Sequence, residues 1–285
     1  MINQLTIIGT GLIGGSLALA LKKANYCNKI VGLGRNPQRL DAACKAGVID
    51  EGTDDYRQGL ANADVVMIST PLSTYATVFE NIKPHINETM VLSDAGSAKR
   101  CVVEAAKQVF GNIPKCLVPG HPIAGNEKSG FEAASPDLYA QRKVLITPLP
   151  ETNTTAITTV TEMWQATGAC VEQIGVDLHD NILAATSHLP HMLAFGLVDS
   201  LAQQNNVDQI FRYAAGGFRD FTRIAASDPV MWRDICLQNR EAVLAALDLY
   251  EQDLAQVRTA IEQGDADTLQ TIFARAKKAR DQFTY

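Results

Sequence analysis

The 285-residue chain lacks the features that define several large classes of protein. No apolar run approaches the roughly 20 residues that a membrane-spanning helix needs. The N-terminus has no basic stretch before its apolar residues, so we expect neither a membrane partner nor a signal peptide. The cysteines show no CxxC or paired spacing, which predicts thiols in a reducing cytoplasm rather than a disulfide framework; they are Cys27, Cys44, Cys101, Cys116, Cys170 and Cys236.

An excess of positive charge is also missing. The net charge is −6 and the isoelectric point is about 5.4, so a general electrostatic attraction to nucleic acid is not expected. An anionic ligand must therefore be held by a local cluster of cations. The 46% hydrophobic residues and a mean hydropathy of −0.03 are typical of a soluble globular protein, and the length suffices for two domains.

The first half of the chain alternates short β-branched runs with segments of helical spacing. We expect helices over residues 16–24, 98–110 and 154–167. This alternation predicts a doubly wound α/β fold of the Rossmann type, with a mainly parallel sheet covered on both faces. The expected strands are residues 4–9, 29–34, 63–70, 89–94, 115–120, 143–148 and 169–174.

The second half has only helical patterns. A mostly apolar helix is expected over residues 177–204, and Ser227-Asp228-Pro229 is a helix start with proline in the first turn. Apolar residues recur at helical spacing from Met231 to Ile261, and a last helix is expected from Asp267 to Phe283. The sequence therefore predicts a nucleotide-binding domain of residues 1–172 and an all-α domain of residues 173–285.

A glycine motif follows the first predicted strand directly and precedes a helical run. In Gly9-x-Gly11-x-x-Gly14, the first glycine allows a tight turn, the second lets a pyrophosphate approach the backbone, and the third lets helix and strand pack closely. The helix N-terminus offers N–H groups to the phosphates. The alternative is a glycine-rich turn without a ligand. The predicted cofactor contacts also include Thr10, Leu12 and Ile13 within the motif and Ser69, Thr70 and Pro71 after the third run.

The end of the second predicted strand bears on the choice between NAD and NADP. An NAD site usually has an acidic residue there, which would repel a 2′-phosphate. Here Gly34 is followed by Arg35, whose guanidinium can pair with that phosphate. We therefore favour NADP over NAD, although an arginine can also stack on the adenine of NAD.

His121 lies between a glycine and a proline, in what we expect to be a stiff glycine-rich turn. Histidine is the side chain whose ordinary pKa allows proton transfer near neutral pH. The alternative is a histidine that is merely packed at a strand end. A dinucleotide site without a metal cluster indicates hydride transfer, and the other motifs show what His121 would face.

Four motifs together resemble the prephenate/arogenate dehydrogenase family of tyrosine biosynthesis, in the family's order and over essentially the whole chain. They are "DAGSAK" (94–99), "PGHPIAG" (119–125), "SHLPH" (187–191) and "GGFRDFTRIAASDPVMW" (216–232). The resemblance implies an NAD(P)-dependent oxidative decarboxylation. A cyclohexadienol loses hydride from its hydroxyl-bearing carbon and carbon dioxide from the opposite carbon, which yields a phenol.

The resemblance also assigns roles on the nucleotide-binding half. It implies that His121 is the catalytic base on the ring hydroxyl and that Ser97 shares this hydrogen bond. Ser97 as an N-cap of the following helix is the alternative, and both could hold.

In the helical half, Arg223 matches the family arginine that grips a substrate carboxylate, and Asp220 one turn earlier is expected to orient it unless the two form a plain surface pair. Arg219 matches no family ligand with certainty. Trp232 matches an aromatic near the substrate, although a core tryptophan is equally plausible.

The resemblance places His191 at the substrate, and His188, on the same helix face, is either a further substrate contact or a structural histidine. No cysteine or carboxylate completes a metal site with the two, so no metal is expected. Pro190 removes a helical hydrogen bond and predicts a kink.

Glu127 matches a family acid near the active site. Glu132 is a candidate partner for the ammonium of arogenate, and the alternative is an exposed acid at a helix start. The preference between prephenate and arogenate stays open.

Two rival interpretations remain. The β-hydroxyacid dehydrogenases pair the same two kinds of domain but use a lysine in the helical half, and no lysine occurs between Lys143 and Lys277. A non-catalytic NADP-binding sensor would need the glycines but not His121, Ser97 and Arg223 together. The long apolar helix faces predict a homodimer formed mainly through the helical half.

Overall fold

The computed structural model describes residues 1–87, 89–126 and 128–282. Its first half contains a six-stranded parallel sheet in the order β3-β2-β1-β4-β5-β6, which is the strand order of a dinucleotide-binding fold. The predicted α/β architecture is therefore confirmed. The strands are β1 (Ile2–Ile8), β2 (Cys27–Leu33), β3 (Glu51–Thr53), β4 (Val65–Ile68), β5 (Val91–Asp94) and β6 (Leu117–Val118).

The remaining strands form a separate small sheet, which the sequence analysis did not predict. β7 (Gly120–Pro122) runs antiparallel to β8 (Lys143–Ile146), and β8 pairs in parallel with β9 (Cys170–Gln173). The chain changes sheets at Pro119, which has no N–H to donate to a strand ladder. His121 consequently lies opposite Leu145 on a strand, and the expected glycine-rich turn is wrong.

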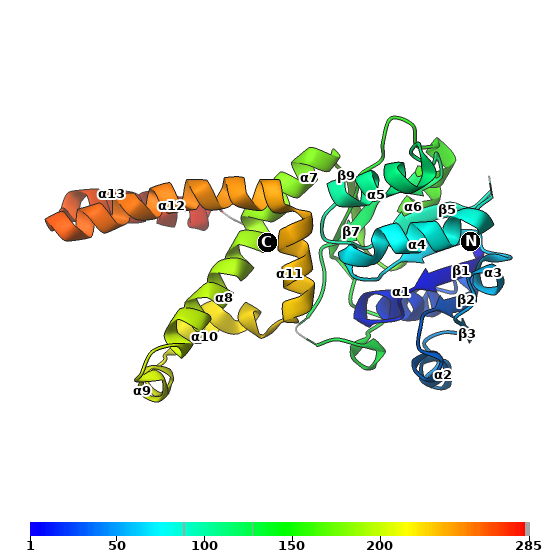
Figure 1. The fold of residues 1–285 in the computed structure, drawn as a ribbon, viewed down its shortest axis with the longest axis horizontal. Helices are drawn as coiled ribbons and strands as arrows, with labels where there is room; N and C mark the ends of the chain where they lie inside the picture. The colour runs from blue at the N-terminus through cyan, green and yellow to red at the C-terminus, as the bar shows by residue number, and fades with distance from the viewer. Residues whose placement is uncertain (88, 127, 283–285) are drawn as a thin grey trace.

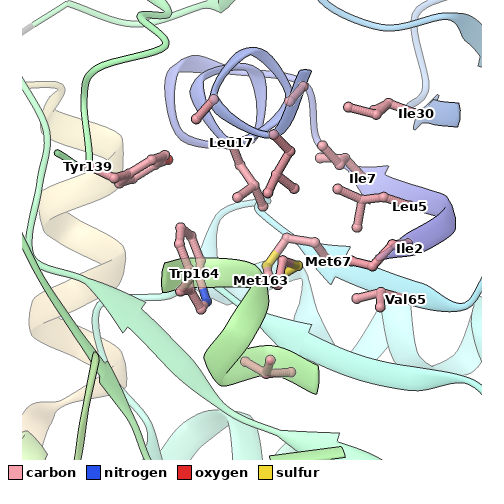
Figure 2. Packing of buried hydrophobic residues seen from close by; sticks show 14 of the residues in the cluster. Ile2, Leu5, Ile7, Leu17, Ile30, Val65, Met67, Tyr139, Met163 and Trp164 are labelled. Carbon is pink, nitrogen blue, oxygen red and sulfur yellow. The ribbon is translucent and has the colours of Figure 1, made fainter. Parts of the chain in front are cut away.

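Helices cover both faces of the main sheet, as Figure 1 shows. On one face, apolar side chains of α1 (Leu12–Lys23) and α6 (Thr154–Ala166) pack against the strands (Figure 2). The rings of Trp164 and Tyr139 are in edge-to-face contact there, with their centroids 5.1 Å apart. The helices of this half are α1 (Leu12–Lys23), α2 (Pro37–Lys45), α3 (Tyr56–Leu60), α4 (Tyr75–Ile82), α5 (Arg100–Phe110) and α6 (Thr154–Ala166), with the 3₁₀ turns η1 (Leu72–Thr74), η2 (Lys83–His85) and η3 (Phe131–Ala133).

The second half is helical, as predicted, and its last two long helices project away from the sheet as a hairpin (Figure 1). The predicted start at Asp228 is confirmed, because its carboxylate accepts a hydrogen bond from the Met231 N–H. The helices are α7 (Val176–Leu183), α8 (Leu189–Ala202), α9 (Val207–Arg212), α10 (Gly216–Thr222), α11 (Pro229–Gln238), α12 (Arg240–Gln263) and α13 (Ala266–Asp281), with the 3₁₀ turn η5 (Arg223–Ala226) between α10 and α11.

The single helix expected over residues 177–204 is divided. A π-helical turn, η4 (Ala184–His188), separates α7 from α8, and Pro190 occupies the first turn of α8. Proline has no N–H for the carbonyl of Thr186, and its ring crowds that carbonyl, so the helix widens locally. The widened turn carries His188, where it meets the first half of the molecule. None of the described helices is both long and apolar enough to span a membrane.

Candidate active site

The glycine motif forms the turn that the sequence predicts. Gly9 has φ +96°, and a Cβ there would lie 2.8 Å from the carbonyl oxygen of Ser69. A Cβ on Gly14 would collide with the Gly9 carbonyl oxygen and the Ile7 side chain, whereas a Cβ on Gly11 would meet nothing within 4 Å. Close packing on two glycines and open space at the third are what a backbone-bound pyrophosphate requires.

The other predicted cofactor residues surround this turn. Leu12 begins α1, and the carbonyl of Ile13 accepts a hydrogen bond from Tyr139 at 2.6 Å. The segment after β4 packs against Gly9 through Thr70, and Pro71 starts η1. The Ser69 hydroxyl is buried without a hydrogen-bond partner among the described residues. The open cradle and this unsatisfied hydroxyl fit a bound dinucleotide.

A pocket of about 380 Å³ opens beside the turn. It contains Arg35, as predicted, and also Arg39, four residues later in α2. Glu132, weighed as a substrate contact, lies in this pocket instead, where its carboxylate is 3.2 Å from the Arg39 guanidinium. The pocket is lined by Thr10, Gly11, Gly34, Arg35, Asn36, Arg39, Leu40, Ser129, Gly130 and Glu132.

A buried ion pair at the end of β5 holds together the segments that carry Ser97 and His121. Asp94 and Lys99 are fully buried and bonded to each other. The Asp94 carboxylate accepts hydrogen bonds from the N–H groups of Gly96 at 2.8 Å and Gly120 at 3.0 Å, and Lys99 donates to the Gly120 carbonyl at 2.7 Å. The pair thus ties the segment of Ser97 to the strand of His121.

His121 is half-buried and contacts a second histidine. Its Nδ1 lies 3.0 Å from Nε2 of His179, which α7 contributes. Burial, together with the nearby His179, Lys99 and His188, lowers the pKa of His121 well below its ordinary value. The imidazole is therefore neutral near pH 7 and able to accept a proton.

His188 joins the helical half to Ser97. The amide Nδ2 of Asn239 lies 3.1 Å from His188 Nδ1, while His188 Nε2 is buried without a hydrogen bond of normal geometry to any described residue. Burial lowers the pKa of His188 to about 4, and the Ser97 backbone beside the ring opposes this shift. Ser97 itself is half-buried and lies three residues before α5, whose N-cap is Lys99, so its expected role as the N-cap is wrong.

Three further predicted substrate residues are neighbours. The rings of His191 and Trp232 are stacked with centroids 3.6 Å apart, and Trp232 also contacts His188. Burial lowers the pKa of His191, and the positive charge of Arg223, in the turn η5 that packs against α8, acts in the same direction. The Trp232 indole N–H is buried without a partner among the described residues. Core packing and proximity to the site both hold for this tryptophan.

Asp220 and Arg219 are exposed on α10, just before Arg223 begins η5. The orienting role of Asp220 stays a prediction. Glu127 lies outside the described residues, so its expected contact with substrate is not visible. Among the residues that the structure describes, no three His, Cys, Asp or Glu side chains are grouped as a metal site requires.

Sequence reasoning missed several residues of this site. Asp180 is 2% exposed, and its carboxylate accepts hydrogen bonds from His179 Nδ1 at 2.7 Å and from the N–H groups of Lys99 and Arg100. It therefore caps α5 from a helix some 80 residues away. The adjacent His179 and Asp180 near the start of the predicted helix were the available signal for this pair. For Arg39, the signal was its spacing of one helical turn from Arg35.

Comparisons with known proteins show the family of the chain. The model of the prephenate dehydrogenase nucleotide-binding domain matches residues 17–173, and that of the prephenate dehydrogenase dimerization domain matches residues 176–275. The chain is 36% identical to a prephenate dehydrogenase of Bacillus subtilis over 99% of its length and 76% of that protein. It is also 36% identical to a cyclohexadienyl dehydrogenase of Zymomonas mobilis, over 98% of this chain and 95% of that one.

A solved structure has the same fold throughout. The prephenate dehydrogenase of Aquifex aeolicus, in complex with hydroxyphenyl propionate and NAD⁺, superposes with a TM-score of 0.90 at 35% identity, over 99% of this chain and 98% of that one. This match, together with the two family models, decides against the β-hydroxyacid dehydrogenase interpretation. The chain belongs to the prephenate dehydrogenase family, the NAD(P)-dependent enzymes of the oxidative decarboxylation that leads to tyrosine.

Proposed function

We propose that the chain oxidises prephenate, arogenate or both, with His121 as the base, Ser97 as a second ligand of the ring hydroxyl and Arg223 as the holder of a carboxylate. The observation that carries this proposal is the proximity of the predicted groups across the two halves. His188, in the second half, lies beside the Ser97 backbone and within electrostatic range of His121. Trp232 contacts His188 and stacks on His191, whose pKa responds to the charge of Arg223. A ring with a hydroxyl at one end and carboxylates at the other spans such a site.

The chemical steps follow from these groups. The ring hydroxyl loses its proton to His121 as hydride leaves the same carbon, and the C–O bond becomes a carbonyl. A bound nicotinamide supplies the hydride acceptor. The bond between the opposite ring carbon and its carboxylate then breaks, carbon dioxide leaves, and the electron pair completes the aromatic ring. The resulting phenolate oxygen takes up a proton.

The substrate is identified by its charges. Prephenate and arogenate both carry carboxylates, and a guanidinium can bind a carboxylate through two parallel hydrogen bonds. They differ in one group, which is a keto group in prephenate and an ammonium in arogenate. Purified protein is to be assayed with each substrate and each cofactor by the absorbance of reduced nicotinamide and by release of carbon dioxide. A protein that binds cofactor but turns over neither substrate would favour the sensor interpretation.

For the cofactor, NADP is proposed over NAD. Arg35 and Arg39 both line the adenosine side of the pocket, and Gly34 stands where an NAD site usually has a carboxylate. Loss of a charged hydrogen bond costs about 1.5–3 kcal/mol, which corresponds to roughly 10–100-fold. Arg35→Asp should therefore raise KM for NADP⁺ by about that factor and leave KM for NAD⁺ within about threefold. An unchanged KM for NADP⁺ would refute the assignment.

The proposed assembly is a homodimer through the helical half. Its support is the matched dimerization domain and the large apolar side chains exposed on α12, among them Leu249, Leu254 and Ile261.

The division into domains of residues 1–172 and 173–285 and a cytoplasmic location complete the proposal. The six cysteines are free thiols in the structure, which supports a reducing compartment.

A further inference from the structure

His179 and Asp180 form a buried extension of the proposed base that the mechanism above does not use. His179 is fully buried, and it bridges His121 and Asp180 through its two ring nitrogens, at 3.0 Å and 2.7 Å respectively. Each neutral imidazole carries one N–H and one lone pair, so the partners of His179 determine which nitrogen carries the proton.

Asp180 sets the direction of the whole chain of hydrogen bonds. Its carboxylate faces donors only: backbone N–H groups of Lys99 at 2.8 Å and Arg100 at 2.9 Å, and His179. Burial opposes ionisation, but the hydrogen bonds from His179 and from both backbone N–H groups lower the pKa of Asp180 overall. An ionised carboxylate can only accept hydrogen bonds, so His179 carries its proton on Nδ1.

The lone pair of His179 then lies on Nε2, toward His121. Burial lowers the pKa of His179, although its contact with Asp180 raises it, so His179 is neutral near pH 7. The 3.0 Å contact is a hydrogen bond only if Nδ1 of His121 carries a proton. A neutral His121 with its proton on Nδ1 has its lone pair on Nε2.

We propose that Asp180 and His179 are positioning residues that hold His121 in the Nδ1–H tautomer, so that Nε2 is the atom that takes the proton of the ring hydroxyl. This inference rests on the proposed role of His121 as the base. When Nε2 gains that proton, the O–H bond breaks and an N–H bond forms. The negative charge of Asp180, acting through the hydrogen bond of His179, stabilises the resulting imidazolium. The opposite tautomer would present an N–H to the hydroxyl and could not accept its proton.

Other charged and titratable groups around the pair do not reverse this direction. Lys99 and His188 face His121, while Lys99, Asp94 and Asp180 face His179. Lys99 is bonded to Asp94 and to the Gly120 carbonyl, and His188 Nδ1 lies against the Asn239 amide. Asp180 is thus the acceptor at which the hydrogen-bonded chain ends.

The test is the tautomer of His121, read from two-bond ¹H–¹⁵N correlations of the full-length protein. The chain has only five histidines, and the His121 signals are identified by their absence in His121→Asn. We expect the Nδ1–H pattern in the wild-type protein. His179→Phe, which removes the acceptor, should shift His121 toward the Nε2–H form. His179→Gln, whose side-chain oxygen can still accept from Nδ1, should retain the wild-type pattern.

Kinetics supply the second measurement. His179→Phe should lower kcat about 100-fold, within the roughly 10²–10⁴ that a positioned general base contributes, with KM and cofactor Kd within about twofold. His179→Gln should recover at least tenfold of that loss. His85→Gln, a histidine in η2 outside these contacts, is the matched control. It should remove only the signals of His85 and leave both the His121 pattern and the rate unchanged.

Three outcomes overturn the inference. They are an Nε2–H pattern for His121 in the wild-type protein, a pattern unchanged in His179→Phe, or a kcat of His179→Phe within about twofold of the wild-type value. Should His179→Phe not fold, the wild-type and His179→Gln spectra still decide the question. A fully active His121→Asn would instead refute the role of His121 as the base, and the tautomer measurement would stand apart from that failure.

Discussion

The two halves of the molecule bury their apolar residues in opposite ways. The nucleotide-binding half contains nearly all described members of both hydrophobic clusters, and the described part of the helical half adds only Phe195, Trp232 and Ile235. Conversely, among the described residues the exposed large hydrophobic side chains other than Met1 and Ile123 lie between residues 178 and 273. The first half thus buries most of its large apolar side chains within one chain, whereas the second exposes apolar surface of the kind that marks interaction sites.

This contrast also separates the chemistry. Groups that act on the reacting atoms are held by the first half, where buried charges such as Asp94 and Lys99 are satisfied by several hydrogen bonds. The groups proposed to recognise the substrate come from the second half, where Arg223 is exposed in a short 3₁₀ turn. Single substitutions in each half should therefore affect different properties: rate, stability, substrate binding or assembly.

The largest effect is expected from the first half. His121→Asn removes the proposed proton acceptor and should lower kcat by about 10²–10⁴, as for loss of a general base. The substitution leaves the glycine turn and the pocket of Arg35 and Arg39 unchanged. The Kd of the cofactor, measured by fluorescence titration, should therefore stay within about twofold. A nearly normal kcat would show that proton removal does not depend on the nucleotide-binding half.

The junction between the halves should respond to pH. His188 has a pKa of about 4 in the folded protein against about 6.5 in an unfolded chain. Between those values the unfolded chain binds a proton that the native state does not, so stability is lost as pH falls from about 6.5 toward 4. The loss is about 3 kcal/mol from this group. His121 and His179, whose pKa values are lowered by burial, act in the same direction.

Urea unfolding at pH 7.5, 5.5 and 4.5 measures this loss. His188→Gln removes one titrating group and should flatten the dependence in this window, whereas His85→Gln should leave it unchanged. Equal slopes in all three proteins would contradict the burial of a neutral histidine at the junction.

Substrate recognition should depend on the second half. Arg223→Gln removes the proposed charged hydrogen bonds to a carboxylate, a loss of about 1.5–3 kcal/mol, and should lower kcat/KM roughly 10–100-fold, mainly through KM. The matched change Arg219→Gln, on the same segment, should alter kcat/KM less than about twofold. If the two variants behave alike, the carboxylate is not held at Arg223.

The smallest effect is expected on assembly. Leu249→Asp places a charge on α12 where a leucine is 62% exposed in one chain, and burial of a leucine in an interface is worth about 1.5–3 kcal/mol. The dimer should therefore dissociate at roughly tenfold or more higher protein concentration in sedimentation equilibrium. Gln108→Asp, on α5 of the first half, should leave the dimer unchanged. A wild-type monomer at micromolar concentration would remove the proposed partner of the exposed face.

The sequence by itself determined the features that depend on neighbours in the chain. The alternation of β-branched runs and helical spacing predicted the parallel sheet, and Gly9, Gly11 and Gly14 predicted the nucleotide turn, because both follow from local periodicity and backbone freedom. The capped start at Asp228 is equally local. The motif match identified the family for the same reason, since it reads residues in order.

Only the tertiary structure decided which distant groups meet. His121 and His179 are 58 residues apart and Lys99 and Asp180 are 81 apart in the chain, yet both pairs are hydrogen-bonded. Periodicity carries no information about such pairs, because they form only when α7 packs against β7 and α5. The separate sheet that places His121 on a strand, and the contact of Glu132 with Arg39, were decided in the same way, by long-range packing.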